Sequence, residues 1–252
     1  MMFVEEKVCV KYIGMLTLAD YLNKHIFRKI PLRRSYLDIR DMMNSLGLTD
    51  NQSTFDALFL LCELIVGIYE QGKAEIVKYY AAIEPINTLV ENINFILGKT
   101  NHKLIKNSNG DRIIIEDNKT ATQAAGLVED PSTAFKILEY NHYALKGDVH
   151  KKKAILLAIG NYVEPILQDK VFKKSAYKQL ADDAGFLLNN FHIRHNNKDG
   201  KTKNKYLDTT EDNENELEQW YDKTYNTLLM LIIAKEQICI SKELKEIKAQ
   251  YF

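Results

Sequence analysis

The fold is decided by residues 130–167, DPSTAFKILEYNHYALKGDVHKKKAILLAIGNYVEPIL, which hold two helix start signals and two apolar stripes. Asp130 precedes Pro131 and Asp148 precedes a second apolar segment. A carboxylate at such a position accepts the unpaired backbone N–H groups of the first helical turn. Apolar residues then recur every three or four positions, as on the buried face of a helix. The stretch predicts one helix from residue 131 to about 145, ended by Gly147, and another over 149–167.

The same periodicity predicts helices on both sides of this stretch, over residues 15–30, 35–46, 54–71, 74–97, 120–129, 176–193 and 210–240. Pro85 and Pro165 lie inside helical patterns and mark expected kinks or breaks. The clear β signal is residues 102–116, where HKLIK and RIIIE flank NSNGD. Asn-Gly between apolar runs is typical of a hairpin turn.

These elements predict a mainly α protein, a helical bundle with one small β-hairpin at about residues 102–116. Residues 1–100 form a helical N-terminal region, 101–118 the hairpin and 119–252 a helical bundle in this interpretation. Short connections between the later helices favour antiparallel neighbours. Whether these parts are separate domains or one continuous helical body stays open.

Composition excludes several classes of protein. The 252 residues hold 34 Lys and Arg against 34 Asp and Glu, so bulk charge does not favour coating of nucleic acid or membrane. The longest apolar runs fall short of the roughly 20 residues that span a bilayer. Cys9, Cys62 and Cys239 lie far apart in apolar runs, which predicts buried thiols in a reducing compartment. We therefore expect a cytoplasmic protein without a membrane segment.

The most unusual segment is residues 187–200, LLNNFHIRHNNKDG, where seven hydrogen-bonding side chains occupy the nine positions 189–197. Arg194 offers a planar cation suited to phosphate oxygens, and His195 can carry a proton near neutral pH. Together they favour metal-free RNA cleavage, with His195 as general acid or base and Arg194 stabilising the phosphorane. An ordinary helix end also carries cations and Asn, so a purely structural interpretation stays open.

Neighbouring residues fit the same hypothesis. Lys198, Lys201 and Lys203 follow the Arg-His pair and would guide an RNA backbone towards it. His142 would be a second proton carrier if the bundle turned it towards Arg194. His192 and His195 are spaced to face one metal ion, but no Cys or nearby acid other than Asp199 completes a site. No metal or cofactor is therefore expected. The motifs of kinases, dehydrogenases, serine hydrolases and zinc peptidases are absent.

The phrase NNFHIRHNN follows EYNHYALKGDVHKKKAILLAI and precedes a long helical pattern with Trp220, Tyr221 and Asp222. In this arrangement residues 131–240 resemble the C-terminal region of bacterial abortive-infection proteins, which is related to the HEPN helical domains. The resemblance implies a helical bundle that pairs as a homodimer and cleaves RNA without metal, in phage defence or a toxin-like system. It implies catalytic roles for His195 and Arg194 and a positioning role for Asn190, with Asn196 and Asn197 beside the phosphates.

The family's usual motif places four to six residues between its Arg and its His, whereas Arg194 and His195 are adjacent. Inactive HEPN modules that bind a nucleotide, nucleic acid or protein partner are common in the family. Two functions are therefore expected as alternatives: a metal-independent endoribonuclease, with RNA as partner, and a catalytically inactive HEPN-like binding module. A cognate regulator is a further expected partner. The RNA substrate and the trigger do not follow from the sequence.

Overall fold

The computed structural model describes residues 7–10, 14–17, 44, 55–63, 65–67, 84–106, 112–194 and 213–251. The chain divides into two compact units, Met1–Ile114 and Ile115–Phe252. The division lies within the segment 101–118 that the sequence analysis placed between its two helical parts. The candidate site lies in the second unit.

The first unit contains a strand pair that the sequence analysis did not predict. Strand β1, Lys7–Val10, pairs antiparallel with β2, Gly14–Thr17. The predicted helix 15–30 is therefore wrong over its first residues, because a short apolar run does not distinguish strand from helix. The remainder of that helix lies outside the described residues, as does most of the predicted helix 35–46.

Other parts of the first unit agree with the predictions. Residues 55–63 and 65–67 are helical, within the predicted helix 54–71. Helix α4 spans Glu84–Lys99, which places Pro85 in its first described turn, and residues 74–83 of the predicted helix 74–97 lie outside the described residues. A proline is tolerated there because the first N–H groups of a helix have no partner within the helix. Strands β3, His102–Lys106, and β4, Arg112–Glu116, form a two-stranded sheet, which confirms the hairpin.

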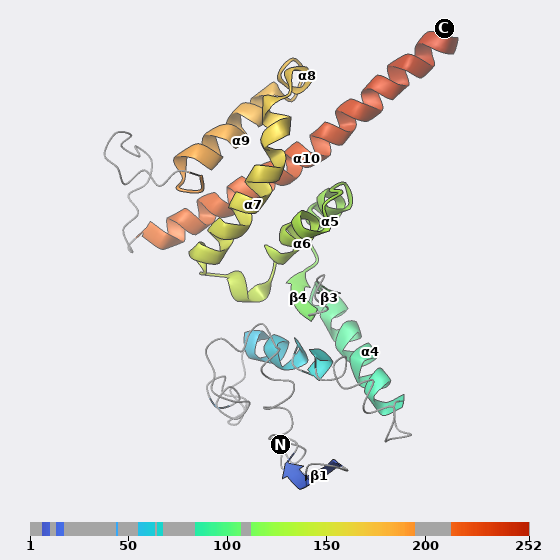
Figure 1. Ribbon diagram of the computed structural model, residues 1–252, viewed down its shortest axis with the longest axis vertical. Helices are drawn as coiled ribbons and strands as arrows, with labels where there is room; N and C mark the ends of the chain where they lie inside the picture. The colour runs from blue at the N-terminus through green and yellow to red at the C-terminus, as the bar shows by residue number, and fades with distance from the viewer. Residues whose placement is uncertain are drawn as a thin grey trace. The chain divides into compact units, whose positions relative to one another are not determined.

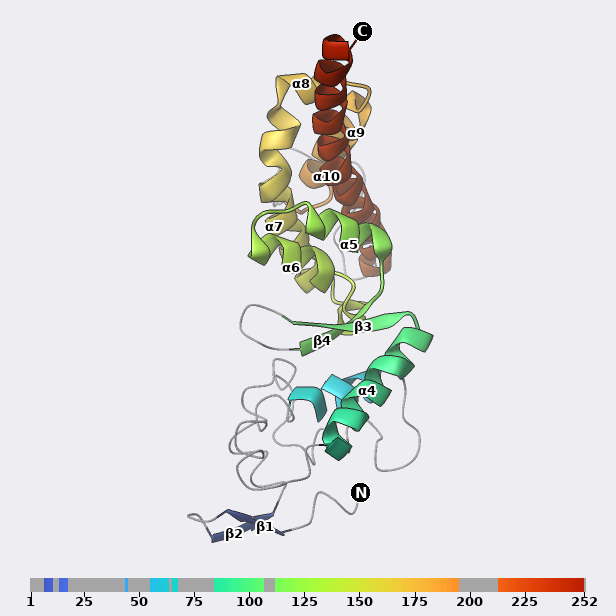
Figure 2. The ribbon, with the colours of Figure 1, turned by 90° about the vertical axis from the view of Figure 1, so that its right-hand side faces the viewer.

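The second unit is a helical bundle, which confirms the predicted fold class. Its elements are α5 (Lys119–Gly126), α6 (Pro131–Glu139), the 3-10 helix η5 (Tyr143–Leu145), α7 (Val149–Gln168), α8 (Lys170–Lys173), α9 (Lys178–Asn190) and α10 (Glu214–Tyr251). Helices α7 and α9 pack against the N-terminal half of α10, and α5 packs on α6 and α10 (Figures 1 and 2).

The start signals at Asp130 and Asp148 are confirmed. The Asp130 carboxylate accepts the N–H groups of Ser132 and Thr133 at the start of α6. Asp148 likewise accepts the N–H of Lys151 at the start of α7. These caps fix where both helices enter the bundle.

Several helix bounds differ from the predictions. Helix α6 ends at Glu139 and a turn leads into η5, so residues 131–145 are not one continuous helix. The short helix α8 was not predicted. Helix α9 begins later than residue 176 and ends at Asn190, before residue 193. Helix α10 continues past residue 240 to Tyr251, where its residues are exposed and packing periodicity cannot reveal its end.

The core of the second unit lies between the facing sides of α7, α9 and α10. Leu156, Ile159, Leu188, Leu228 and Leu229 are fully buried there. The cysteine expectation is wrong for Cys239, which is exposed where α10 leaves the bundle, and Cys62 is only partly buried. Both are free thiols, and nothing is described of the Cys9 side chain.

Candidate functional site

The predicted site residues fall into two groups. Asn190 and Arg194 belong to the described part of the chain, at the end of α9 and in the turn after it. The remaining predicted site residues are His195, Asn196, Asn197, Lys198, Lys201 and Lys203, and all of them lie outside the described residues. The contacts described below are therefore those of residues 190–194, at the end of α9 and directly before His195.

The turn after α9 is held inside the bundle by its apolar residues. Phe191 and Ile193 are each 2% exposed. The Phe191 ring stacks on Trp220 of α10, with ring centroids 4.5 Å apart. His192, which lies between Phe191 and Ile193 in the sequence, adopts a positive φ of 58° and is itself buried. This left-handed backbone reverses the chain, and the N–H of Arg194 donates to the carbonyl of Leu188 at 3.1 Å.

A glycine on α7 allows the end of α9 to approach closely. A Cβ atom built on Gly160 would lie 2.9 Å from Cδ2 of Leu188 and 3.8 Å from Nε of Arg194. Contacts below 3.0 Å do not occur for real Cβ atoms without a shift of the neighbour, and Leu188 is completely buried. Gly160 thus leaves the space that the Leu188 side chain occupies.

Arg194 is bound to α7. Its Nη2 donates to the carbonyl oxygen of Gly160 at 2.8 Å, and the same nitrogen forms an ion pair with Glu164. The Arg194 side chain is 15% exposed, whereas that of Glu164 is 41% exposed. The guanidinium therefore already has an anionic partner on the side that reaches solvent. A phosphate oxygen would bind at this nitrogen only by replacing the Glu164 carboxylate.

Asn190 makes a different contact. Its side-chain amide donates to the carbonyl of Phe186, one turn earlier in α9, at 2.8 Å, and this bond is exposed. The bonds described for Asn190 and for Arg194 have no partner in common. The two residues lie at the same helix end, but Asn190 is turned to its own helix and Arg194 to α7.

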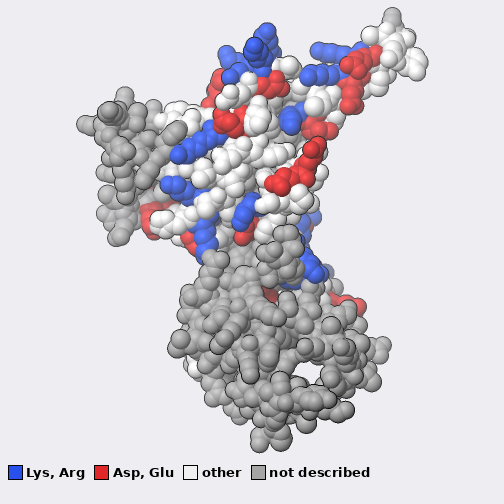
Figure 3. All heavy atoms as spheres, in the orientation of Figure 1, with Lys and Arg blue, Asp and Glu red and all other residues white. Residues whose placement is uncertain are grey.

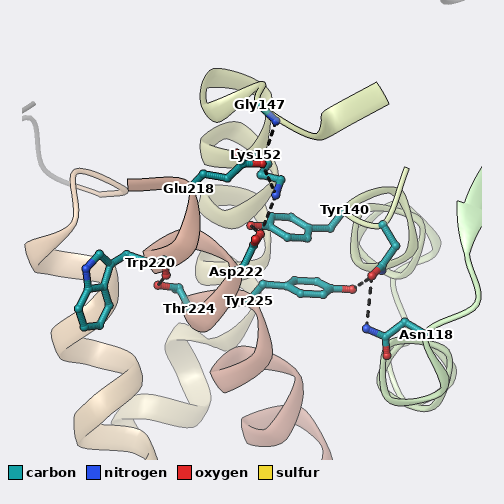
Figure 4. Close-up of polar contacts among 10 residues, drawn as sticks. Asn118, Tyr140, Gly147, Lys152, Glu218, Trp220, Asp222, Thr224 and Tyr225 are labelled. Atoms are coloured by element: carbon teal, nitrogen blue, oxygen red, sulfur yellow. Dashed lines mark hydrogen bonds and ion pairs between the residues drawn. The ribbon is translucent and has the colours of Figure 1, made fainter. Parts of the chain in front are cut away.

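A second polar cluster joins α7 to α10 (Figure 4). Nζ of Lys152 lies 2.8 Å from Oε1 of Glu218 and 2.7 Å from Oδ1 of Asp222. The Lys152 side chain is only 9% exposed. The Tyr140 hydroxyl donates to the same Asp222 oxygen at 2.9 Å, and the N–H of Gly147 donates to Glu218 at 2.8 Å. The buried ammonium group thus contacts two carboxylates, and each carboxylate accepts one further hydrogen bond, Asp222 from Tyr140 and Glu218 from Gly147.

Aromatic stacking continues this cluster towards α5. The rings of Tyr140 and Tyr225 stack with centroids 4.0 Å apart. The Tyr225 hydroxyl donates to the carbonyl of Ile137 at 2.6 Å and accepts from the Asn141 amide at 2.7 Å. Asn118, which caps α5, donates to Asn141 at 3.3 Å. The chain of bonds ties α5, α6 and α10 together and is structural in character.

Burial and charge shift the pKa values of three tyrosines of the bundle and of Glu218. Burial raises the pKa of Tyr221 to about 12. It also raises the pKa of Tyr140, with a further rise from the negative charge of Asp222, and the pKa of Tyr225. Burial alone would raise the pKa of Glu218, but hydrogen bonds from Lys152 and Gly147 outweigh it and leave that pKa below its ordinary value. The cluster thus favours protonated tyrosines and an ionised Glu218.

His142 is not turned to Arg194 by any contact described for it. It is 8% exposed, pairs through its backbone with Ile115 and packs its ring on Tyr143 at 4.6 Å. Its neighbours Tyr140 and Asn141 contact α10. The structure therefore gives this segment a role in joining elements of the bundle.

Two residues of α7 that join it to its neighbours were not predicted from the sequence. Lys152 contacts α10, and Glu164 contacts Arg194 after α9. Lys152 stands on the apolar line of α7, three residues after Val149 and three before Ile155. A lysine at such a position signals a buried cation with acidic partners, because an isolated charge there is costly. Glu164 carries no comparable signal, since it precedes Pro165 on a partly exposed face.

Among the described residues, no group of three or more His, Cys, Asp or Glu side chains is placed to hold a metal ion. No helix in the part of the chain that the structure describes is both long and apolar enough to cross a membrane. No protein-family model, curated protein or solved structure matches this chain.

Proposed function

We propose that this chain is a HEPN-like protein of the abortive-infection type that acts as a metal-independent endoribonuclease, with His195 as its proton-transferring residue. The observation that carries the proposal is the anchored Arg194. Arg194 is the residue directly before His195, and its side chain is bound to α7 while its backbone N–H is bound to α9. A catalytic side chain needs such support, because small displacements cost large factors in rate.

In this proposal the 2′-oxygen of RNA attacks the adjacent phosphorus, and the bond from phosphorus to the 5′-oxygen breaks. His195 removes the proton of the 2′-hydroxyl while water supplies one to the leaving 5′-oxygen, or His195 supplies that proton while water accepts the one from the 2′-hydroxyl. The products are a 2′,3′-cyclic phosphate and a 5′-hydroxyl. Lys198, Lys201 and Lys203, with Asn196 and Asn197, contact the RNA backbone by charge and hydrogen bonding.

The contacts of Arg194 divide its proposed role into two cases. If Arg194 stabilises the phosphorane, the substrate replaces Glu164, and Glu164→Gln strengthens RNA binding by removing the competing charge. If Arg194 only positions the segment, Glu164→Gln loosens the turn and weakens cleavage. Comparing RNA affinity and cleavage rate for this variant separates the two roles. Asn190 remains a positioning residue in both, with Asn190→Ala as its test.

The central experiment is cleavage of total cellular RNA in excess EDTA. The wild type is compared with His195→Ala and with His150→Ala, a matched control because His150 is exposed at the start of α7. We expect cleavage by the wild type and the control, loss in His195→Ala, and cyclic-phosphate ends. Equal cleavage by all three proteins would contradict a role for His195.

The second candidate function is a catalytically inactive HEPN-like module that binds a nucleotide, RNA or protein partner. The ion pair between Arg194 and Glu164 favours it, because a neutralised guanidinium stabilises a phosphorane less than a free one. An inert wild type that still binds labelled RNA, with affinity reduced by Lys201→Ala, would support an RNA-binding module. Homodimerisation and a cognate regulator, implied by the family resemblance, are proposed for both candidates.

A further inference from the structure

The last turns of α10 carry an apolar stripe that the bundle does not cover. Figure 1 shows this end of α10 extending away from α7, α8 and α9. Ile240, Leu244, Ile247 and Tyr251 are 39%, 47%, 51% and 77% exposed. Their spacing of four, three and four residues is that of alternating d and a positions in a heptad repeat. The four side chains therefore lie along one face of the helix.

This face is not the continuation of the side that packs in the bundle. The buried heptad line of α10 runs through Leu217, Tyr221, Thr224, Leu228 and Leu231. At the same spacing it continues through Lys235, Ile238, Lys242 and Lys245, which are mostly charged. Each residue of the apolar stripe comes two positions after a residue of this line. Because two residues make more than half a helical turn, the stripe lies on a different side of the helix. The sequence thus changes its apolar face at the point where α10 leaves the bundle.

The charged residues beside the stripe indicate what kind of molecule packs against it. With Leu244 and Tyr251 at a positions, Glu243 stands at g and Lys248 at the following e. In a parallel coiled coil of identical chains, a g residue meets the e residue of the next heptad on the other helix. Neither residue has an opposite charge three or four positions away on its own helix, where such pairs form. Both are exposed and thus available to another chain.

A membrane surface fits the stripe less well than a second helix does. The polar sides of this helix end carry Lys242, Lys245 and Lys248 together with Glu243 and Glu246, and both signs of charge are visible along it in Figure 3. A helix that binds an anionic membrane surface has a predominantly basic polar face. The mixed charges suit an identical helix better, because Glu243 of each copy can meet Lys248 of the other.

We propose that α10 of a second copy of this chain packs in parallel and in register against Ile240, Leu244, Ile247 and Tyr251, with Glu243 of each copy paired to Lys248 of the other. The interface lies at the opposite end of α10 from the Arg194 turn. It does not depend on the ribonuclease proposal, and an inactive module would assemble in the same way.

The first test measures the mass of the full chain by sedimentation equilibrium over a range of concentrations. Because the stripe covers only about three turns, we expect a reversible dimer with a dissociation constant on the order of micromolar. Ile247→Glu places a charge on the stripe, and Ala249→Glu places the same charge on the outer f position. We expect the first to weaken association at least tenfold and the second to leave it unchanged, with equal helix content by circular dichroism.

The second test uses the charge pair to read orientation. Glu243→Lys and Lys248→Glu each put like charges at the proposed contact, so each variant alone should associate more weakly than the wild type. Mixing the two variants restores both opposite-charge pairs, and the mixed species should exceed its statistical share. The double variant Glu243→Lys/Lys248→Glu should recover wild-type association.

The outcomes decide the proposal. A single-chain mass up to about 200 μM would overturn it. So would a dimer that Ile247→Glu leaves intact, since its interface would then lie elsewhere. Association that is lost in Ile247→Glu, but without preferential mixing of the charge variants, would overturn the parallel in-register arrangement.

Discussion

Lys152 and Asp222 form an ion pair of 2.7 Å between α7 and α10, and the lysine side chain is 9% exposed. Glu218 completes the surroundings of the ammonium group from the same face of α10. Removal of the lysine would leave two carboxylates beside each other without their cation, one on the largely buried Glu218 and one on the half-exposed Asp222. The cluster therefore specifies how α7 and α10 align.

Lys152→Ala should lower the free energy of unfolding by about 1.5–3 kcal/mol, the range for hydrogen bonds that involve a charged group. Glu218 would lose its cation in a largely buried position, whereas water can solvate the half-exposed Asp222. Lys153→Ala, one residue along and outside this cluster, is the control. Urea denaturation followed by far-ultraviolet circular dichroism measures both. A loss in Lys152→Ala no larger than that in Lys153→Ala would show that the ion pairs contribute nothing net.

Gly160 and Gly185 provide a matched pair of glycine-to-alanine changes. Gly185→Ala should raise the free energy of unfolding by about 0.5–1 kcal/mol, since a helical alanine is preferred and no atom lies within 4 Å of its Cβ. Gly160→Ala should lack this gain, because the new Cβ would displace the buried Leu188. Thermal unfolding of both variants tests this, and equal stabilisation would disprove the close approach of α9 to α7.

Arg194→Ala should lower the free energy of unfolding by about 1.5–3 kcal/mol, the range for hydrogen bonds that involve a charged group. Arg194→Lys should not restore it fully, because an ammonium cannot reproduce the planar guanidinium contacts with Gly160 and Glu164. The measurement is urea denaturation of the three proteins. It bears on the anchoring role alone, and full stability of Arg194→Ala would refute that role.

Alkaline pH should destabilise the second unit through its buried tyrosines. Burial raises the pKa of Tyr221 to about 12 in the folded chain, against about 10 in the unfolded chain. The resulting stability is fully present below about pH 10 and is lost as the pH rises towards 12, because the unfolded state then releases the proton more readily. Denaturation midpoints at several pH values measure the loss, which Tyr221→Phe should reduce. A pH-independent midpoint in this interval would contradict it.

Those parts of the fold that depend on local chemistry were predictable from the sequence. Asp130 with Pro131 and Asp148 act within a few residues as helix start signals, and both were confirmed. The two strands that flank the Asn-Gly signal pair as expected, while the turn itself lies outside the described residues. The end of α6 was not predictable, because Tyr140 leaves the helix where Asn141 and Tyr225 bond across the bundle. Such contacts join positions more than 80 residues apart.

For the candidate site, the sequence showed only that many polar residues lie close together around Arg194. The cluster around Arg194 is visible in the sequence, but its partner Glu164 is 30 residues away and belongs to another helix. Only the packing of α9 on α7 at Gly160 brings the pair together. Sequence spacing therefore indicated where polar chemistry gathers, but not that the guanidinium is already bound to a carboxylate.

Helix α10 is one continuous helix with two environments, since Leu228 and Leu231 are fully buried and residues 240–251 are exposed. Backbone amides in its first half can exchange with deuterium only when the bundle opens. Those near its end are released by fraying of the helix alone. Hydrogen-exchange rates along α10 should therefore rise towards Tyr251. If a second chain packs on the final segment, exchange of the amides there should become slower at higher protein concentration.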